Sequence, residues 1–355
     1  MSDADALKLT TYFGERDRAG ERFLADALVD LYAAHRLRTS LVMRGVEGFG
    51  VKHHLHTDRL LTLSEDLPIV SVAVDLRPRV EAALDEVVAL CGDGLITLER
   101  ARMPDAAALP DVHEETKLTV YLGRGERAGG RPAHMAVVEA LHRRGVAGAT
   151  VLLGVDGTAR GERRRARFFA ANAQVPLMVV AVGAGERIAT ALPDLRALLV
   201  EPLVTLERVR VCKRDGRRLA APEPVAGTDP SGLAVWQKLM VYCGEQSRHA
   251  QRPLYAEIVH ALRSAGAAGA TALRGIWGYH GDHAPHGDSF RQLRRRVPVV
   301  TVIVDTPEHV ARWFAIVDAL TDETGLVTSE QVPALRAAGP GIARGGLRLA
   351  DPGVR

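Results

Sequence analysis

The sequence predicts an α+β fold built from three tandem copies of one unit of about one hundred residues. Three observations predict it. A strand-like segment with Lys, Leu, Tyr and Gly in register occurs at 7–14, 116–123 and 237–244. Short motifs containing Gly, Pro and Thr then follow in the same order each time. Strand-like and helix-like hydrophobic periods also alternate in one order, which indicates duplication of a complete structural unit.

The spacing between copies is nearly constant. Lys8 and Lys117 are 109 residues apart, and Thr97 and Thr205 are 108 apart. The segments between the copies contain several prolines and are expected to be linkers. The tail 334–355 is rich in Gly, Pro, Ala and Arg without an apolar period, so we expect it to be disordered. The predicted copies are 7–102, 116–210 and 237–333.

The first half of the unit is predicted as strand, helix, strand. Residues 7–13 alternate between apolar and polar side chains, which is typical of a half-buried strand. Residues 23–32 carry apolar side chains at helical spacing. A second strand at about 40–46 leads into a long loop that contains Gly and His.

The second half is predicted as strand, helix, strand. Residues 69–75 are almost all apolar, residues 80–88 have helical spacing, and Gly92 is suited to ending that helix. A last strand at 95–99 closes the unit. The complete order, strand–helix–strand–strand–helix–strand, is the ferredoxin-like motif.

Several short segments of the first copy suggest a family. They are Val46–Gly50, Asp66–Val70, Gly92–Gly94, His56–Thr57 and Ser64–Pro68. Through them the chain resembles PII signalling proteins, and most closely the PII-like family catalogued as domain of unknown function number 190. PII proteins are homotrimers with nucleotide sites between subunits. The resemblance therefore implies an intramolecular pseudo-trimer that is a monomer in solution. It also implies a phosphate-binding loop at Gly92, Asp93 and Gly94.

Lysine is rare in this chain, yet it recurs at one position of every copy. The chain has five lysines, and arginine supplies the other 41 of its 46 basic residues. Lys8, Lys117 and Lys238 occupy equivalent positions and share a strand face with a tyrosine. A lysine is a compact point charge that suits phosphate, so these three are candidate ligand-binding residues. The alternative is an exposed strand-start residue carried along by the duplication.

Glycines cluster where the second strand of each copy ends. Glycine lets a backbone approach a phosphate and present its N–H groups, so these residues are candidates for lining a ligand site. The alternative is a tight exit into a long loop. The candidates are Gly45, Gly48, Gly50, Gly154, Gly157, Gly275 and Gly278.

The loop of the third copy combines imidazoles and carboxylates within nine residues. Such groups could bind zinc, copper or nickel. A polar, mobile recognition loop is the alternative, because no helix fixes two ligands on one face. The candidate metal ligands are His280, Asp282, His283, His286 and Asp288.

The remaining features narrow the class of function. The formal charge is only +3, which gives no case for nucleic-acid binding. We find no signal peptide, membrane-span-length apolar run or disulfide framework, so we expect a cytoplasmic protein. Common catalytic motifs are missing, and we expect no enzymatic activity. The favoured function is a regulator that binds a small anion, such as an adenine nucleotide, and contacts a protein partner through its loops. A metal sensor and a ligand-free interaction module are the alternatives.

Overall fold

The computed structural model describes most of the chain, and the described residues contain six helices and a large antiparallel sheet. The described residues are 4–50, 56–57, 66–92, 94–104, 112–164, 175–223, 235–280, 284–287, 297–339, 342–344, 346–347 and 349. None of the helices among them is long and apolar enough to cross a membrane.

The first copy has the predicted order of main elements, with a small hairpin inserted before its first helix. Its elements are β1 (Ala4–Gly14), β2 (Arg18–Ala19), β3 (Arg22–Phe23), α1 (Leu24–Ala34), β4 (Thr39–Arg44), β5 (Glu47–Phe49), β6 (His56–Thr57), β7 (Pro68–Leu76), α2 (Arg77–Leu90) and β8 (Gly94–Met103).

The second copy repeats this order. Its elements are β9 (Glu115–Gly123), β10 (Arg127–Ala128), β11 (Arg131–Pro132), α3 (Ala133–Arg143), β12 (Gly148–Leu153), β13 (Asp156–Ala159), β14 (Glu162–Arg163), β15 (Pro176–Ala184), α4 (Gly185–Leu198) and β16 (Leu203–Arg208). Two further strands follow it, β17 (Arg210–Arg214) and β18 (Arg217–Arg218).

In the third copy one continuous strand includes the start of the loop. Its elements are β19 (Trp236–Gly244), β20 (Arg248–His249), β21 (Arg252–Pro253), α5 (Leu254–Ser264), β22 (Ala270–His280), β23 (His286–Gly287), β24 (Pro298–Asp305), α6 (Pro307–Leu320) and β25 (Leu326–Val332). After it come β26 (Ala334–Gly339) and β27 (Ile342–Arg344).

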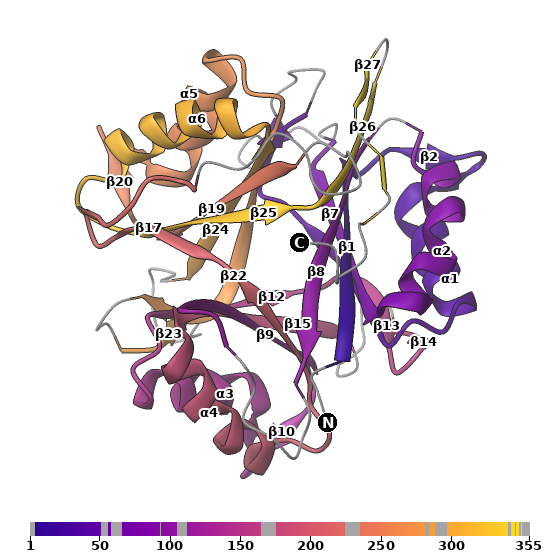
Figure 1. Cartoon of the computed structure of the whole chain (residues 1–355), viewed down its shortest axis with the longest axis horizontal. Coiled ribbons are helices and arrows are strands. Elements are labelled where there is room, and N and C mark those ends of the chain that lie inside the picture. The colour runs from indigo at the N-terminus through magenta and orange to yellow at the C-terminus, as the bar shows by residue number, and fades with distance from the viewer. Residues whose placement is uncertain are drawn as a thin grey trace.

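Each copy packs its two helices against one face of its own strands. In the first copy Leu24, Leu28 and Tyr32 recur at helical spacing on α1 and are buried against Leu7 and Leu9 of β1. The other faces of the three sets of strands contribute to one shared core, which includes Val72, Val180 and Val302. Figure 1 shows the resulting arrangement, with three helix pairs on the outside and the strands between them.

The start of each loop crosses to a neighbouring copy and extends its sheet. β5 pairs with β22 of the third copy, β13 with β4 of the first, and β22 with β12 of the second. The three copies thus form a closed cycle, in which each gives a strand to one neighbour and receives one from the other.

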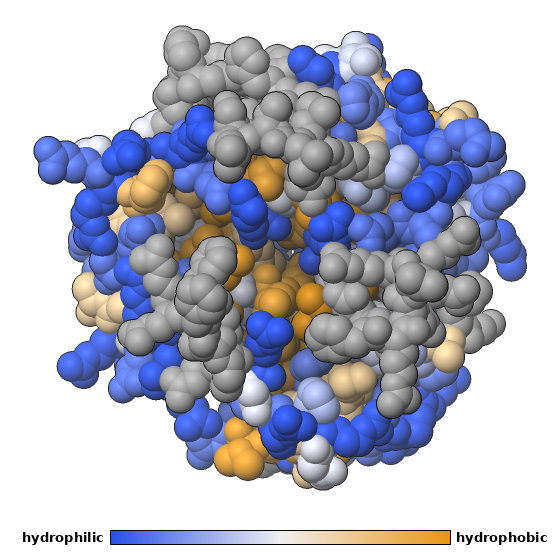
Figure 2. All heavy atoms as spheres, turned by 180° about the vertical axis from the view of Figure 1, so that it is seen from behind, coloured by the Kyte–Doolittle hydropathy of each residue, from blue (hydrophilic) through white to orange (hydrophobic). Residues whose placement is uncertain are grey.

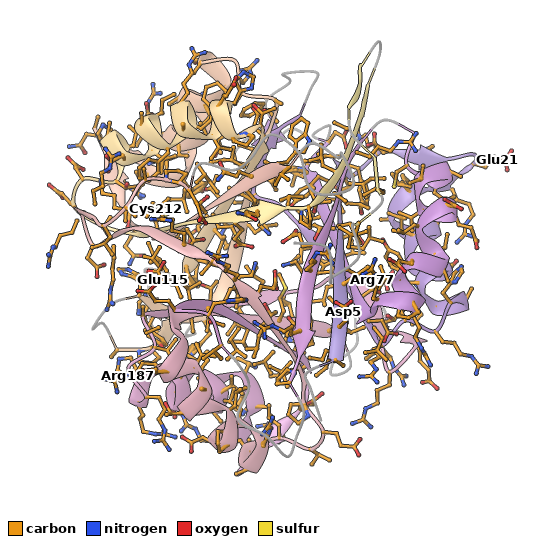
Figure 3. The ribbon with its side chains drawn as sticks, in the orientation of Figure 1. Asp5, Glu21, Arg77, Glu115, Arg187 and Cys212 are labelled. Carbon is orange, nitrogen blue, oxygen red and sulfur yellow. The ribbon has the colours of Figure 1, made fainter. Side chains whose placement is uncertain are left out.

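The segments after the second and third copies also pair with a neighbouring copy. β17 lies antiparallel to β25, and Glu115 Oε2 accepts a hydrogen bond of 2.6 Å from the backbone N–H of Val211, next to Cys212 (Figure 3). β26 lies antiparallel to β8, with Leu335 buried. The expectation of a linker between the second and third copies is therefore wrong for the residues that form β17. The expectation of a disordered tail from 334 is wrong for the part that forms β26 and β27. Backbone pairing stabilises these short segments despite their lack of an apolar period.

One face of the molecule is hollowed at its centre. Figure 2 shows hydrophobic side chains inside this hollow and hydrophilic ones at several places on its rim. The shared core also has partly exposed members at one end of its strands, among them Tyr12, Leu95 and Leu203.

Candidate functional site

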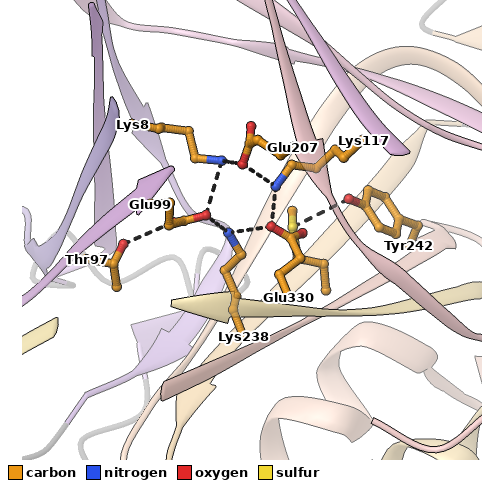
Figure 4. A network of polar contacts seen from close by, with 9 residues as sticks. Lys8, Thr97, Glu99, Lys117, Glu207, Lys238, Tyr242 and Glu330 are labelled. Carbon is orange, nitrogen blue, oxygen red and sulfur yellow. Dashed lines mark hydrogen bonds and ion pairs between the residues drawn. The ribbon is translucent and has the colours of Figure 1, made fainter. Parts of the chain in front are cut away.

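Three lysines and three glutamates from all three copies meet in the middle of the molecule (Figure 4). In each copy the lysine of the first strand lies opposite the glutamate of the last strand, so both side chains leave the same face of the sheet. The cross-strand pairs are Lys8–Glu99, Lys117–Glu207 and Lys238–Glu330.

The six charged groups form a closed ring of alternating sign, which we call the Lys/Glu ring. Within a copy the Nζ–Oε2 distances are 3.3 Å for Lys8–Glu99, 2.8 Å for Lys117–Glu207 and 3.0 Å for Lys238–Glu330. Between copies, the hydrogen-bonded pairs are Lys8–Glu207, Lys117–Glu330 and Lys238–Glu99. Every Oε2 atom is therefore shared by two ammonium groups, and every ammonium group joins two copies.

The ring is buried, and opposite charges within it offset the cost of burial to different degrees. The side chains of Lys117 and Lys238 are only 2% and 3% exposed, and that of Lys8 is 10% exposed. Burial favours a neutral carboxyl group at Glu99, but Lys238 and Lys8 outweigh this and lower its pKa well below the usual value. Burial opposes the charge of Lys238, but Glu330 and Glu99 raise its pKa above the usual value.

The other ring members differ in how these effects balance. Burial lowers the pKa of Lys117, and its two glutamates do not fully offset this. At Lys8, Glu207 and Glu99 outweigh burial and raise the pKa. The pKa of Glu330 is lowered, since Lys117 and Lys238 outweigh its burial. Unpaired charges would be very costly at this depth, so the ring is stable only as a complete set.

This placement changes the interpretation of the three repeated lysines. They are not exposed strand-start residues, because all three are buried. Their prediction as ligand-binding residues gains no support either, since each ammonium group already contacts two carboxylates. The glutamates were missed, although a signal for them exists. A Thr-x-Glu motif recurs in the last strand of every copy, at 97–99, 205–207 and 328–330.

The three ring carboxylates also resemble a metal site, since their oxygens lie within 4.8 Å of one another. The chemistry argues against a cation there. The Oε2 atoms already accept from two ammonium groups each, and three positive charges lie between them. A metal ion would have to displace lysines whose charges already neutralise the carboxylates.

The repeated glycines allow close contact between copies. A Cβ atom at Gly48 would lie 2.6 Å from the carbonyl oxygen of Ala270, and one at Gly157 would lie 2.1 Å from that of Ser40. At Gly278 the corresponding distance is 2.3 Å to the oxygen of Ala149. These three glycines lie where a loop strand crosses the neighbouring copy, so their structural role is the close crossing.

A second set of glycines packs against the proline that begins the third main strand of the same copy. A Cβ atom would lie within 2.6 to 2.8 Å of an atom of that proline, which explains why glycine recurs there. These are Gly45 against Pro68, Gly154 against Pro176, and Gly275 against Pro298. Close packing therefore explains why glycine recurs in both sets, without a bound phosphate.

Two of the predicted glycines, both in the first copy, have open space at the Cβ position. Nothing lies within 4 Å of a Cβ atom at Gly50 or Gly92, and Gly94 meets only the carbonyl oxygen of Tyr12 at 3.3 Å. Asp93, between the last two, lies outside the described residues. Gly92 is thus a predicted phosphate-binding glycine with open space at its Cβ position.

Two strands, β17 after the second copy and β26 after the third, each place a basic residue opposite the same position of a last strand. Arg336 of β26 lies opposite Ile96, and Lys213 of β17 lies opposite Val327, the equivalent residue of the third copy. Lys213 is neutralised, since its Nζ lies 2.7 Å from Asp318 Oδ1. Arg336 acts electrostatically on Cys91, which places its charge near the end of α2. Among the described residues, no carboxylate forms an ion pair with it.

Comparison with protein families agrees with the internal repetition. The profile of the DUF190 family, described as an uncharacterized conserved family, matches residues 6–103, 115–211 and 236–334. The chain belongs to the DUF190 family. This confirms the resemblance to that family and the three tandem copies predicted from the sequence.

A comparison with solved structures adds no argument about function. The DUF190 chain aligns with an aspartate kinase from Synechocystis at 13% identity and a TM-score of 0.25. The alignment covers 96% of the DUF190 chain but only 45% of the kinase, so the chain spans less than half of that protein.

The His/Asp loop of this DUF190 chain is described only in part. Asp282, His283 and Asp288 lie outside the described residues. His280 Nδ1 lies 3.7 Å from Asp215 Oδ1, and His286 Nδ1 lies 2.9 Å from the carbonyl oxygen of Ala284. Within the described part of the chain, the ring glutamates form the one group of three potential ligands close enough to hold a metal. The metal site at this loop therefore stays a prediction.

The loop of the second copy is attached to the first copy by an arginine. Arg163 of β14 contacts Asp26 and Asp30 of α1 as well as Asp156 of its own copy. Three carboxylates raise its pKa, although burial opposes this. The start of each loop is thus fixed on a neighbouring copy by strand pairing. The loop of the second copy is also fixed by the ion pairs of Arg163.

Proposed function

We propose that this DUF190 chain is a PII-like regulatory protein without enzymatic activity. In this proposal the three copies are ferredoxin-like units that form a covalent pseudo-trimer. A small anionic effector binds between two copies. The candidate that we favour is an adenine nucleotide. Binding changes the order of a loop, and the loop signals to a protein partner.

The closed cycle of strand exchange supports the pseudo-trimer. Every copy gives a loop strand to one neighbour, and the Lys/Glu ring joins all three copies through one set of ion pairs. Two neighbouring copies in the same chain are present at very high effective concentration, so closure within one chain is favoured over association with a second chain. We therefore expect one chain per particle.

The observation that carries the effector proposal is the position of Arg336. It comes from the strand after the third copy, yet it lies opposite Ile96 of the first copy and acts electrostatically on Cys91 at the end of α2. An arginine that forms no ion pair with a carboxylate among the described residues suits a phosphate group. The equivalent Lys213 of β17, which lies against the third copy, is neutralised by Asp318. We therefore propose that the junction between the third and first copies is the effector site.

The three loops support the signalling part of the proposal. Their bases are held on neighbouring copies by equivalent strands, but their sequences differ, with imidazoles in the first and third and arginines in the second. A rigid scaffold with divergent loops is typical of recognition by loops. An effector bound beside a loop base could change the order of that loop through local charge.

The test is isothermal titration calorimetry of the full chain with ATP, ADP, AMP, cyclic AMP and cyclic di-AMP. We expect at least one of them to bind with one site per chain. Arg336→Gln should weaken this binding about 10- to 100-fold, since a charge-assisted hydrogen bond contributes about 1.5–3 kcal/mol.

The matched control is Arg208→Gln, because the Arg208 side chain is 65% exposed and lies on another part of the sheet. It should leave the affinity unchanged. If no nucleotide binds at millimolar concentration, the nucleotide proposal is wrong. If a nucleotide binds equally well to Arg336→Gln and the parent chain, the effector site lies elsewhere.

A further inference from the structure

We propose that the axial core of this protein holds two ordered water molecules next to the Lys/Glu ring. One bridges Thr328 and Glu330, and the other bridges Thr10 and Glu207. Both sites are independent of any effector, so this inference does not rest on the proposed function.

The first copy shows how the second oxygen of a ring carboxylate can be satisfied directly. Each ring glutamate uses Oε2 for its two lysines, which leaves Oε1 as a buried acceptor. At Glu99 this acceptor receives a hydrogen bond of 3.1 Å from the hydroxyl of Thr97, two residues earlier on β8 (Figure 4). The carboxylate of the first copy is therefore fully hydrogen-bonded within the protein.

The third copy has the same residues without this bond. Glu330 Oε1 and the hydroxyl of Thr328 are both buried, and neither has a hydrogen-bond partner among the residues that the structure describes. Both residues are at least 96% buried, and their separation by two positions places them on the same face of β25. A water molecule between them would supply the contact that Thr97 makes directly in the first copy.

The second site joins two copies. Glu207 Oε1 and the hydroxyl of Thr10 are buried and unpartnered as well. Thr10 follows Lys8 on the same face of β1, and Lys8 binds Glu207. Lys8 is therefore the neighbour of Thr10 along this strand face and the ion-pair partner of Glu207. Buried polar groups without partners are rare in folded proteins, and ordered water is their usual partner.

Charge decides between water and an ion. The ring is neutral in sum, with three ammonium groups and three carboxylates. A cation at Oε1 would be repelled by the nearby ammonium groups. An anion would be repelled by the carboxylate oxygens, and it has no proton with which to form a hydrogen bond to them. Water can donate to Oε1 and also donate to or accept from a threonine hydroxyl. It is the ligand that satisfies both groups without adding charge.

The test is a crystal structure of the full chain at about 1.5 Å, from native crystals and from crystals soaked in thallium(I) or bromide. We expect a solvent peak within hydrogen-bond distance of Glu330 Oε1 and Thr328 Oγ1, and a second near Glu207 Oε1 and Thr10 Oγ1. Neither peak should show anomalous signal from either ion. Empty density at both places, or an anomalous peak at either, would overturn the proposal.

A variant separates the two sites. Thr328→Val keeps the shape of the side chain but removes its hydroxyl, so the peak at Glu330 should be lost or weakened while that at Glu207 remains. Thr97→Val is the matched control, because it removes a hydroxyl that bonds directly to a carboxylate. An unchanged peak at Glu330 in Thr328→Val would show that the threonine does not hold this water.

Discussion

Lys117 on β9 forms an ion pair with Glu330 on β25, and 213 residues separate the two along the chain. Together with its two counterparts this pair joins the copies at their common centre. The Lys/Glu ring gives the three copies a shared polar layer within an apolar core. Its consequences can be measured in several ways.

Burial of the lysines predicts their reactivity towards amine reagents. Four of the five lysines lie in the part of the chain that the structure describes, and all four are buried, Lys213 included. An N-hydroxysuccinimide ester should therefore modify these four at least tenfold more slowly in the folded chain than in urea. Peptide mass spectrometry of both states measures this. Rapid labelling of Lys117 in the folded chain would contradict the buried ring.

Removal of one ring charge should be strongly destabilising. Glu207→Gln leaves Lys8 and Lys117 with one carboxylate each, and breaking a buried ion pair on one side costs about 3–5 kcal/mol. The free energy of unfolding in urea is the measurement. Glu162→Gln is the control, because the side chain of Glu162 is 70% exposed and its pair with Arg164 should contribute no more than about 1 kcal/mol. Equal effects of the two substitutions would contradict this role of the ring.

The ring also predicts a dependence of stability on pH. The pKa values of Glu99 and Glu330 are lowered in the folded chain, so their contribution is present above the unfolded carboxyl pKa of about 4.3 and is lost as the pH falls towards the folded values. The free energy of unfolding should fall between about pH 5 and pH 3. Glu99→Gln should make this fall shallower. An unchanged acid profile in that variant would argue against the lowered pKa of Glu99.

The close crossing between copies predicts that substitution by alanine changes stability at one glycine but not at another. Gly157→Ala would bring a Cβ atom to 2.1 Å from the backbone oxygen of Ser40, so the neighbouring strand must shift. We expect a loss of about 1–3 kcal/mol, as for other overpacked positions. Gly50→Ala should change little, because nothing lies within 4 Å of its Cβ position. Thermal unfolding of both variants tests the difference, and equal melting temperatures would refute the crossing.

The last strand pair predicts the effect of truncation. A chain that ends at Pro333 loses β26, which pairs with β8 and buries Leu335. Burial of a leucine contributes about 1.5–3 kcal/mol, and an unpaired edge promotes association. We expect lower stability in urea and increased light scattering. A chain that ends at Arg344 keeps both strands and loses only the partly buried Leu347 and Leu349 from this core, so it should lose less stability than the shorter chain.

The local pattern was sufficient to predict the repeated unit. Alternation and helical spacing predicted the main strands and helices of each copy, because those patterns reflect burial on one face of a local element. The additional small hairpins, such as β2 and β3, were missed, since two-residue strands carry no periodic signal. Strands β17 and β26 were missed for another reason. Their stability comes from pairing with a distant strand and leaves little trace in their own composition.

The amino-acid sequence by itself determined the number of copies, the order of their elements and the unusual recurrence of lysine. It did not determine what the lysines contact, because a lysine that faces a phosphate and one that faces a carboxylate look the same in a strand pattern. Only the tertiary structure brought Lys8, Lys117 and Lys238 together with glutamates from two copies each. The physical reason is burial, since a charge taken from water must find an opposite charge, and here the nearest one belongs partly to another copy.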